Sequence, residues 1–259
     1  MKLFRFCGLI TALMLFSASV AVSGPILKPR KYYGPIPRSA LSLRVGFHGG
    51  ANNEQMWGFI DGLYQRPAGD ENTDDFGNAI ILDATYTYKL HPQFAFRLDG
   101  SLSILRSASK GYFVPATEDT IQPIYDFSRR FNVDLFVIET SGVYYFTDAS
   151  VNGFQPYIGA GFSAGFPRAT YKEGFTDRDS GTIIRDNSNT EWSLEAGVHA
   201  LLGALYYISN SFAFTAETRF QILQSKFPIE IDTEEGRKTV KFDVDYEGFV
   251  ISVGGAWAF

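Results

Sequence analysis

The most regular feature of the chain is a strict alternation of apolar and polar residues, repeated in several separate runs. Between Asn78 and Leu90 every second residue is aliphatic or aromatic, and the residues between them include Asp83, Thr85 and Lys89. A period of two places successive side chains on opposite faces of a β-strand. The alternation therefore predicts strands with one apolar face and one polar face.

Eight such runs follow one another from Leu41 to the end of the chain. Their predicted bounds are 41–50, 78–90, 94–104, 131–146, 155–166, 191–208, 212–224 and 246–259. The alternation of the fourth run, which starts at Phe131, is interrupted between Glu139 and Gly142. A β-bulge is the expected cause of this interruption.

The predicted connections between these strands alternate in length. Long polar connections cover 51–77, 105–130, 167–190 and 225–245, and short ones cover 91–93, 147–153 and 209–211. Transmembrane β-barrels show this pattern, with short periplasmic turns and longer extracellular loops. The sequence therefore predicts an all-β fold, an eight-stranded antiparallel transmembrane β-barrel with up-and-down meander topology. An even number of strands places both chain ends on the periplasmic side.

Aromatic residues gather near both ends of the predicted strands. The set near the short turns is Tyr86, Tyr88, Phe94, Tyr144, Tyr145, Tyr206, Tyr207, Phe212, Trp257 and Phe259, and the set near the long connections is Phe47, Phe131, Phe166, Trp192, Phe227 and Phe242. Two such bands are typical of the interfacial girdles of a membrane barrel. A soluble ligand-binding barrel with core aromatics is the alternative, and the place of the bands along the strands favours the membrane.

Residues 1–23 have the pattern of a secretory signal peptide. Lys2 and Arg5 precede an apolar run, Leu9–Val22, which ends in small residues that suit cleavage before Gly24. This run is shorter than the roughly 20 apolar residues that a membrane-spanning helix needs. The pattern therefore predicts export through the inner membrane.

Residues 24–40 are rich in proline and basic residues, and proline interrupts regular structure. We interpret them as a periplasmic linker before a barrel domain of residues 41–259, with a basic strap against anionic headgroups as the alternative. The only cysteine, Cys7, lies in the predicted signal peptide, so the mature chain has no thiol for a disulfide. The net charge of −5 argues against nucleic acid as a partner.

The last strand ends on an aromatic residue, and its final positions form a pattern. Ser252, Gly254, Trp257 and Phe259 resemble the carboxyl-terminal recognition signal of bacterial outer-membrane β-barrels. That signal reads polar, any, Gly, any, any, aromatic, any, aromatic. The stretch 155–161, Gln-Pro-Tyr-Ile-Gly-Ala-Gly, resembles a Pro-Tyr-aliphatic-Gly opening common in such barrels. From residue 41 to residue 259 the chain resembles the small eight-stranded barrels related to the OmpA transmembrane domain and OmpW.

The resemblance implies a bacterial outer-membrane protein that lies among outer-membrane lipid and lipopolysaccharide. It also implies the barrel assembly machinery as a partner and a monomeric state. No cofactor or metal ion is expected. The non-enzymatic members of the resembled group lead us to expect a structural or surface-contact role through the long extracellular loops. A narrow channel for small solutes or hydrophobic compounds, of the OmpW kind, is the alternative.

Charged and titratable residues on the polar faces of the predicted strands form one set. Its members are Arg44, Asp83, Lys89, Arg97, Asp99, Glu139, Glu195, His199, Glu217 and Arg219. An Arg or Lys on the lipid face costs ~2–4 kcal/mol at the membrane midplane, so we expect these side chains to point into the lumen. Side chains fill the interior of an eight-stranded barrel. The set is therefore either a structural salt-bridge plug or the lining of a narrow, gated path.

Some small outer-membrane barrels are lipid-modifying enzymes, and a hydrolase needs a nucleophile, a base and an orienting acid. The three histidines are His48, His91 and His199, and no serine stands two residues from any of them, as it does in outer-membrane deacylases. We therefore expect no enzymatic activity and no catalytic residues.

The predicted connection 51–77 contains two further patterns. The acidic run Asp70–Asp75 departs from the calcium-binding loop of EF-hands, and a solvated loop is expected there and around Asp177, Asp179 and Asp186. The segment Gln55–Tyr64 suits a short amphipathic helix at the outer headgroups or simple loop packing.

Overall fold

The structure is a computed structural model, and it describes residues 37–51, 72–74, 76, 79–113, 124–147, 153–233 and 236–259. The predicted signal peptide, most of the predicted linker, the segment Gln55–Tyr64 and half of the acidic run Asp70–Asp75 lie outside these residues. The described strands are β1 (Ser39–Gly49), β2 (Asn72–Asp74), β3 (Ala79–His91), β4 (Phe94–Phe113), β5 (Tyr125–Tyr145), β6 (Phe154–Asp177), β7 (Ile183–Trp192), β8 (Glu195–Tyr207), β9 (Phe212–Ile222), β10 (Gln224–Thr233), β11 (Gly236–Asp245) and β12 (Gly248–Ala258).

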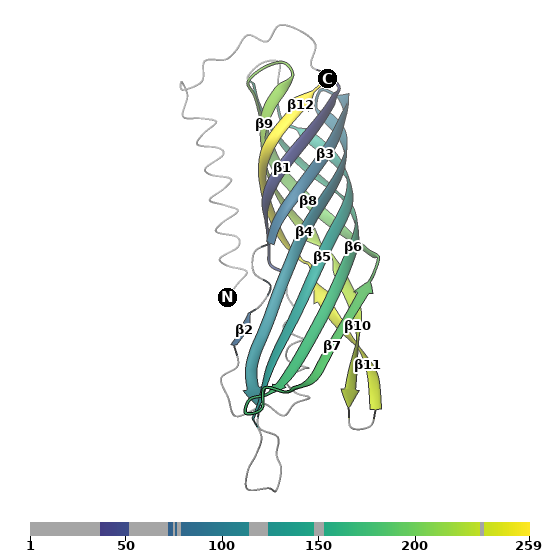
Figure 1. The fold of residues 1–259 in the computed structure, drawn as a ribbon. Helices are drawn as coiled ribbons and strands as arrows, with labels where there is room; N and C mark the ends of the chain where they lie inside the picture. The colour runs from purple at the N-terminus through teal and green to yellow at the C-terminus, as the bar shows by residue number, and fades with distance from the viewer. Residues whose placement is uncertain are drawn as a thin grey trace, which may run out of the picture.

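Eight antiparallel strands close into a barrel (Figure 1). Around the ring the order is β1, β3, β4, β5, β6, β8, β9, β12, and β12 pairs again with β1. The first and last strands meet at one end, where the Phe259 amide donates to the Ser39 carbonyl at 2.9 Å. We call this the terminal end and the opposite end the loop end. The predicted eight-stranded antiparallel meander is confirmed.

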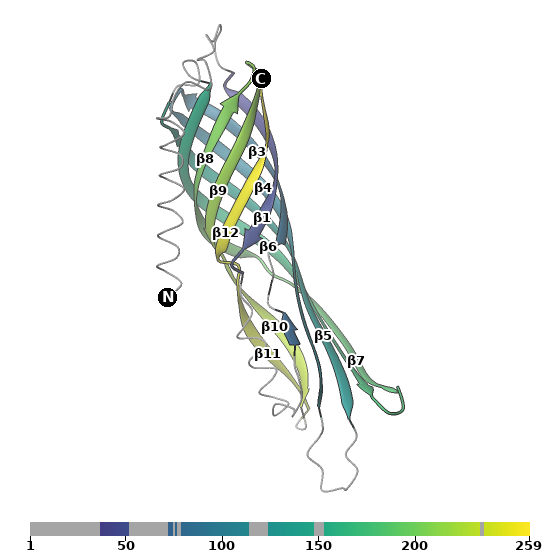
Figure 2. The same cartoon turned by 90° about the vertical axis from the view of Figure 1, so that its left-hand side faces the viewer.

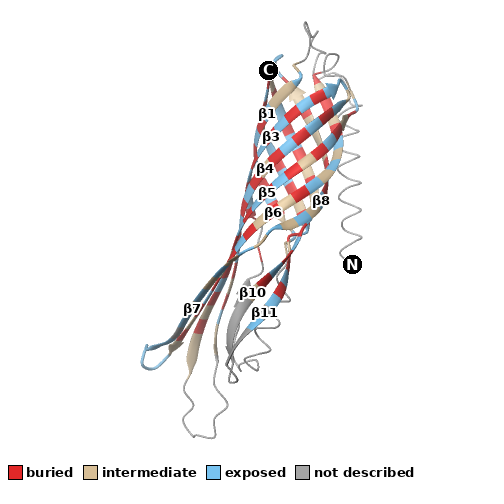
Figure 3. Cartoon of the chain, turned by 90° about the vertical axis from the view of Figure 1, so that its right-hand side faces the viewer, coloured by how far each residue is buried: buried red, intermediate tan, exposed pale blue. Residues whose placement is uncertain are grey.

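Near the terminal end, buried and exposed residues alternate along each strand (Figure 3). The exposed positions of the wall there are mostly apolar, and the buried positions include many polar and charged residues. Phe47 is 61% exposed and Leu82 is 58% exposed on the outside of the wall. Arg97 and Asp99 are buried on the inside. A barrel that exposes its apolar face and buries its charges is suited to a lipid surrounding, where only closed structures satisfy the backbone.

Toward the loop end the sense of the alternation reverses. Strands β4, β5 and β6 run on together far beyond the barrel wall formed by their neighbours (Figure 2). In this extension Phe131, Val133 and Leu135 are buried on the inner face, whereas Arg130 is exposed on the outer face. The reason is the solvent outside the wall, because a strand in water buries its apolar face and exposes its polar one.

The predicted bulge between Glu139 and Gly142 is wrong. Strand β5 pairs in unbroken register with β4 and with β6 through these residues. Val137 and Glu139 both point inward and are buried, whereas Ile138 points outward. Inward and outward side chains alternate without interruption along β5. Only the type of residue that points inward changes, from apolar to polar.

All four predicted long connections contain further strands or strand extensions, and the first of them, 51–77, holds β2. Residues 105–130 and 167–190 hold the outer parts of β4, β5 and β6 together with β7, and residues 225–245 hold the hairpin β10–β11. The predicted strand 191–208 is two strands, since β7 ends at Trp192 and β8 begins at Glu195. The chain changes position there because β7 pairs with the outer part of β6 and β8 with its inner part.

The predicted aromatic bands are only partly correct. Outward-facing members such as Phe94, Trp192 and Phe259 are exposed as expected. Five members are buried inside the barrel instead: Phe131, Tyr145, Tyr207, Phe227 and Phe242. They stand at inward positions of their strands, so they pack in the interior and do not reach an interface.

A hydrogen-bonded turn joins β6 to β7 at the loop end. The Asp177 carboxylate accepts hydrogen bonds from the Ser180 amide at 2.7 Å, the Ser180 hydroxyl at 2.8 Å and the Asp179 amide at 3.1 Å. The hydrogen bonds from Ser180 lower the pKa of Asp177 below its ordinary value. Gly181 adopts a φ of 67°, which glycine tolerates without strain.

Candidate functional site

A layer of buried charges crosses the barrel interior at the level of the apolar exterior. Strand register builds it, since Arg44 on β1 stands opposite Asp83 on β3, and Asp99 on β4 stands opposite Glu139 on β5. The structure brings eight of the ten residues of the predicted set into one connected group. We call these eight the lumen charge cluster: Arg44, Asp83, Arg97, Asp99, Glu139, His199, Glu217 and Arg219.

Glu217 on β9 joins three side chains through a single carboxylate oxygen. Its Oε2 accepts hydrogen bonds from Arg44 Nη1 at 2.8 Å, Arg97 Nη1 at 2.6 Å and the Tyr157 hydroxyl at 2.8 Å. The Arg97 guanidinium also lies 5.6 Å from the centre of the Tyr157 ring. Four strands are therefore tied together at this oxygen, on the terminal-end side of the cluster.

Asp83 and Asp99 accept hydrogen bonds from the Nη2 atoms of the same two guanidiniums. Arg44 Nη2 donates to Asp83 Oδ1 at 2.7 Å and to Asp99 Oδ1 at 3.0 Å, and Arg97 Nη2 donates to Asp99 Oδ1 at 2.7 Å. The Thr85 hydroxyl donates to Asp99 Oδ1 at 2.5 Å. The Arg44 guanidinium thus bridges three carboxylates and the Arg97 guanidinium two, an arrangement that fixes both arginine side chains.

Arg219 forms the other half of the cluster. It makes an ion pair with Glu139 on β5 and lies 3.3 Å from Asp83 Oδ2 on β3. Glu139 also accepts a hydrogen bond from the Ser163 hydroxyl at 3.0 Å. Because β3, β5 and β9 lie at separate places around the ring, these contacts cross the lumen.

The charges of the cluster nearly balance. Four carboxylates meet three guanidiniums, so the cluster carries one net negative charge when His199 is neutral and every carboxylate is ionised. Buried charges are tolerated when they are paired and hydrogen-bonded. Breaking one of these pairs therefore leaves a charge in a closed interior.

His199 lies between two serines that the sequence does not place near it. Ser141 Oγ is 2.8 Å from His199 Nε2, and Ser163 Oγ is 2.8 Å from His199 Nδ1. Glu139 Oε1 is 3.4 Å from the same Nδ1. Serine, histidine and glutamate thus stand in the order that a hydrolase uses. Strand pairing creates the group, since Gly161 stands opposite both Ser141 and His199.

This serine–histidine–glutamate group is buried inside the barrel. Ser141, Ser163 and His199 are all buried. The small cavity at the terminal end reaches Arg44 and Arg97, and its lining does not include the three residues. The hydrogen bonds fix the imidazole within the wall, and the absence of enzymatic activity stays a prediction.

Lys89 and Glu195 belong to the predicted set but lie outside the cluster. Lys89 is buried nearer the terminal end, where its Nζ donates to Gln155 Oε1 at 3.2 Å and lies 5.1 Å from the centre of the Tyr145 ring. Glu195 lies on the loop-end side and accepts a hydrogen bond from the Ser225 hydroxyl at 2.9 Å. Their positions at either end of the lumen separate them from the central charges.

Apolar and aromatic side chains fill the lumen on both sides of the cluster. On the loop-end side a buried apolar core contains Leu105, Phe131, Val133, Leu135, Leu223, Phe227 and Val244, among others. On the terminal side Tyr145, Tyr157, Tyr207 and neighbouring aliphatic residues form a second core. The cavity that remains there has a volume of about 20 Å³, which is room for about one water molecule.

The four residues of the predicted assembly signal lie on the last strand, and their facing follows the alternation. Ser252 is buried at an inward position, whereas Trp257 and Phe259 are exposed on the outer face. Trp257 packs edge-to-face against Phe212 with ring centroids 5.2 Å apart. Gly254 lies where β12 closes against β1, opposite Arg44. Recognition of these residues by assembly machinery stays a prediction.

Neither a metal site nor a membrane-spanning helix is present in the part of the chain that the structure describes. No group of three or more His, Cys, Asp or Glu residues in that part is arranged to hold a metal ion. The same residues contain no helix that is long and apolar enough to cross a membrane.

Comparison with known proteins identifies the fold. No protein-family model and no curated protein sequence matches the chain. Among solved structures, the outer membrane protein OprG from Pseudomonas aeruginosa matches with a TM-score of 0.53 and 17% identity, over 86% of this chain and 97% of OprG. The chain has the fold of the small outer-membrane β-barrels. Neisserial surface protein A matches at a TM-score of 0.41 and 13% identity, over 87% of this chain and 100% of that protein.

The predicted resemblance to small outer-membrane barrels is therefore confirmed as a likeness of fold. The predicted location in the bacterial outer membrane agrees with this fold and with the apolar exterior. In such a barrel the short turns lie on the periplasmic side, so the terminal end is periplasmic and the loop end is extracellular. The lumen charge cluster then lies within the membrane.

Proposed function

We propose that this outer-membrane barrel is non-enzymatic, that its lumen is closed, and that it acts through its extracellular strands in envelope structure and surface contact. The observation that carries the proposal is the filled lumen. Three layers follow one another along its axis: the periplasmic tyrosines, the lumen charge cluster and the extracellular apolar core. An eight-stranded barrel has an interior that side chains can fill completely.

The extracellular part of the barrel supports a contact role. The pairing of β5 with β6 continues to Tyr125 and Asp177, and β7 adds a further strand to the same sheet. At the far tip Arg178 binds Asp126 with a contact of 2.5 Å and lies over the Tyr112 ring. Continuous ladders hold this surface in one shape, so a partner meets an ordered sheet that projects from the membrane.

A closed lumen predicts that the inserted protein conducts no measurable ion current across a bilayer. The refolded mature chain, inserted into a planar bilayer, is expected to give no discrete single-channel conductance steps, because ion pairs and packed side chains fill the lumen. Insertion is checked independently by protease protection of the transmembrane strands. Reproducible steps that change when Arg97 or Glu217 is neutralised would contradict the closed lumen and support transport.

The narrow channel remains the alternative because the extracellular wall has a cleft beside β8. This cleft has a volume of about 610 Å³ and is lined by Glu195, Ala196, Ile222, Gln224, Ser225, Lys226, Asp243 and Asp245. Leu223 is buried behind it and packs against the backbone at Gly165 and Gly197. Leu223 is therefore one of the buried side chains that separate this cleft from the lumen.

Leu223→Ala separates the two functions. With a closed lumen the variant stays silent in the bilayer, because the lumen charge cluster lies beneath the apolar core. Its free energy of unfolding is expected to fall by about 2–5 kcal/mol through the cavity that the substitution leaves. A sideways channel predicts the opposite electrical result, a conductance that appears or increases in the variant.

A further inference from the structure

The outward face of β5 and β6 changes from apolar to charged within one row of residues, and the charged residues beyond that row are mainly basic. Phe136 and Phe166 stand opposite each other, with ring centroids 6.1 Å apart, at the extracellular edge of the apolar exterior. Two residues further along each strand, Asp134 stands opposite Arg168. The Arg168 guanidinium lies 5.4 Å from the centre of the exposed Trp192 ring. Tryptophan and basic residues in this position are typical of a membrane interface.

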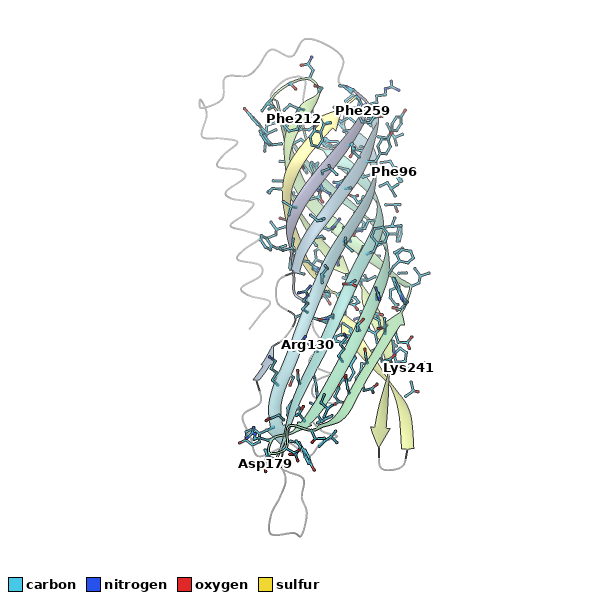
Figure 4. All side chains as sticks on the ribbon, viewed as in Figure 1. Phe96, Arg130, Asp179, Phe212, Lys241 and Phe259 are labelled. Atoms are coloured by element: carbon cyan, nitrogen blue, oxygen red, sulfur yellow. The ribbon has the colours of Figure 1, made fainter. Side chains whose placement is uncertain are left out.

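Beyond Arg168 the outward face stays basic. Its exposed members, which we call the basic face, are Arg106, Lys110, Arg130, Arg168 and Lys172. The labelled Arg130 lies on the extracellular extension, far from the periplasmic Phe212 and Phe259 (Figure 4). From Arg168 to the row of Lys110 the register advances six residues on β6, which is roughly 20 Å along the strand.

Two of these residues are placed against each other. Arg130 on β5 and Lys172 on β6 are directly opposite in the register, and like charges in that position repel. Among the residues that the structure describes, none of the five basic side chains forms an ion pair. Such a pair is stabilised when an anion lies between the two cations.

The other side of the extracellular barrel lacks this excess of exposed basic residues. On the hairpin β10–β11, Lys226 is paired with Asp243 at 3.5 Å, and Asp245 and Glu247 follow along the chain. The positive charge is therefore concentrated over β4–β6 and is not a general property of the extracellular surface. An anionic partner therefore binds on the side of the barrel formed by β4–β6.

We propose that the basic face binds the phosphate groups of the lipopolysaccharide in the outer leaflet. Acyl chains pack on the apolar exterior around Phe136 and Phe166, and the phosphates next to them reach Arg168 and then Arg130 and Lys172. Arginine binds phosphate with paired donors, and lysine adds a point charge. The inference rests on the outer-membrane location in the proposed function, and it is independent of whether the lumen conducts.

Charge-matched variants test the inference. Arg168→Gln/Lys172→Gln removes two charges from the basic face, and the control Lys226→Gln/Lys241→Gln removes two from the exposed hairpin. Binding of bisphosphorylated lipid A to the folded full chain in neutral detergent is measured by native mass spectrometry. The first variant is expected to bind at least about tenfold more weakly than the unaltered chain. The control is expected to bind as the unaltered chain does.

Three results would overturn the inference. The first is an equal loss of lipid A binding in both variants, which would indicate general charge attraction. The second is undiminished binding in Arg168→Gln/Lys172→Gln, with its fold verified by heat-modifiable electrophoretic mobility. The third is binding of inorganic phosphate alone on the same residues with the affinity of lipid A, which would make free phosphate the ligand. A conductance measurement tests only whether the lumen is closed, so its result does not affect these three outcomes for lipid A binding.

Discussion

Replacing Glu217 by alanine is expected to lower the free energy of unfolding by about 3–5 kcal/mol. One oxygen of this carboxylate accepts hydrogen bonds from Arg44, Arg97 and Tyr157. Its loss leaves two buried guanidiniums that share Asp99 as their remaining common partner. Equilibrium urea unfolding of the refolded barrel in lipid vesicles, followed by tryptophan fluorescence, measures the change.

A buried neighbour provides the control for Glu217→Ala. Ser101 is buried at an inward position next to Asp83 in the register, and Ser101→Ala removes a small polar group without removing a charge. We expect it to cost about 1 kcal/mol. Combining Glu217→Leu with Arg97→Met removes both members of a pair, and the double variant is expected to lose less than the sum of the single ones. A loss below about 1 kcal/mol in Glu217→Ala would show that the lumen charges contribute little to stability.

Replacing Gly254 by valine is expected to prevent closure of the barrel, the second large effect. Gly254 lies on β12 opposite Arg44 on β1, and a Cβ built there would overlap the Leu43 carbonyl oxygen and the Arg44 backbone. The β1–β12 pair is the seam that closes the ring, so a displaced β12 leaves two open edges in lipid. The refolded fraction, measured by heat-modifiable mobility in vesicles, is expected to fall several-fold at least.

Gly100→Val is the matched control for this substitution. Gly100 lies on β4, and a Cβ there would meet nothing within 4 Å. We expect it to refold like the unaltered chain. Because refolding in vesicles needs no assembly machinery, the experiment separates closure of the seam from the predicted role of Gly254 in recognition. Normal refolding of Gly254→Val would show that the seam has room for a side chain and would leave recognition as the reason for glycine.

The strands of the barrel were predictable because lipid outside and paired charges inside impose opposite residue types on alternate positions. Where water replaces lipid, the inner face becomes apolar and the outer face polar. Residue type alone does not show this reversal in the sequence. Phe131 and Val133 alternate as regularly as the membrane-facing residues, yet they are buried inside the extracellular core. The change at Glu139 resembled a bulge because residue type alone does not say which side of the wall a strand shows to water.

The charge pairs could not be predicted from the sequence. Inward facing follows from the alternation, but partners depend on the stagger between strands and on contacts across the lumen. Arg219 on β9 meets Glu139 on β5, which is 80 positions away in the chain. The contact of His199 with Ser141 and Ser163 does not follow from sequence proximity, because strand pairing brings these residues together. Inward-facing serines on the strands beside the histidine strand are the sequence signal that points to it.

The sequence by itself determined the antiparallel strands of the membrane wall, the short periplasmic turns and the inward placement of the charged residues, because each follows from a period of two and from the cost of charge in lipid. Only the tertiary structure decided which charges pair, that apolar cores fill the lumen on both sides of them, and that exposed cations of β4–β6 lie together beyond the apolar exterior. These features depend on ring closure and on the register between strands, which bring together residues that are distant in the chain.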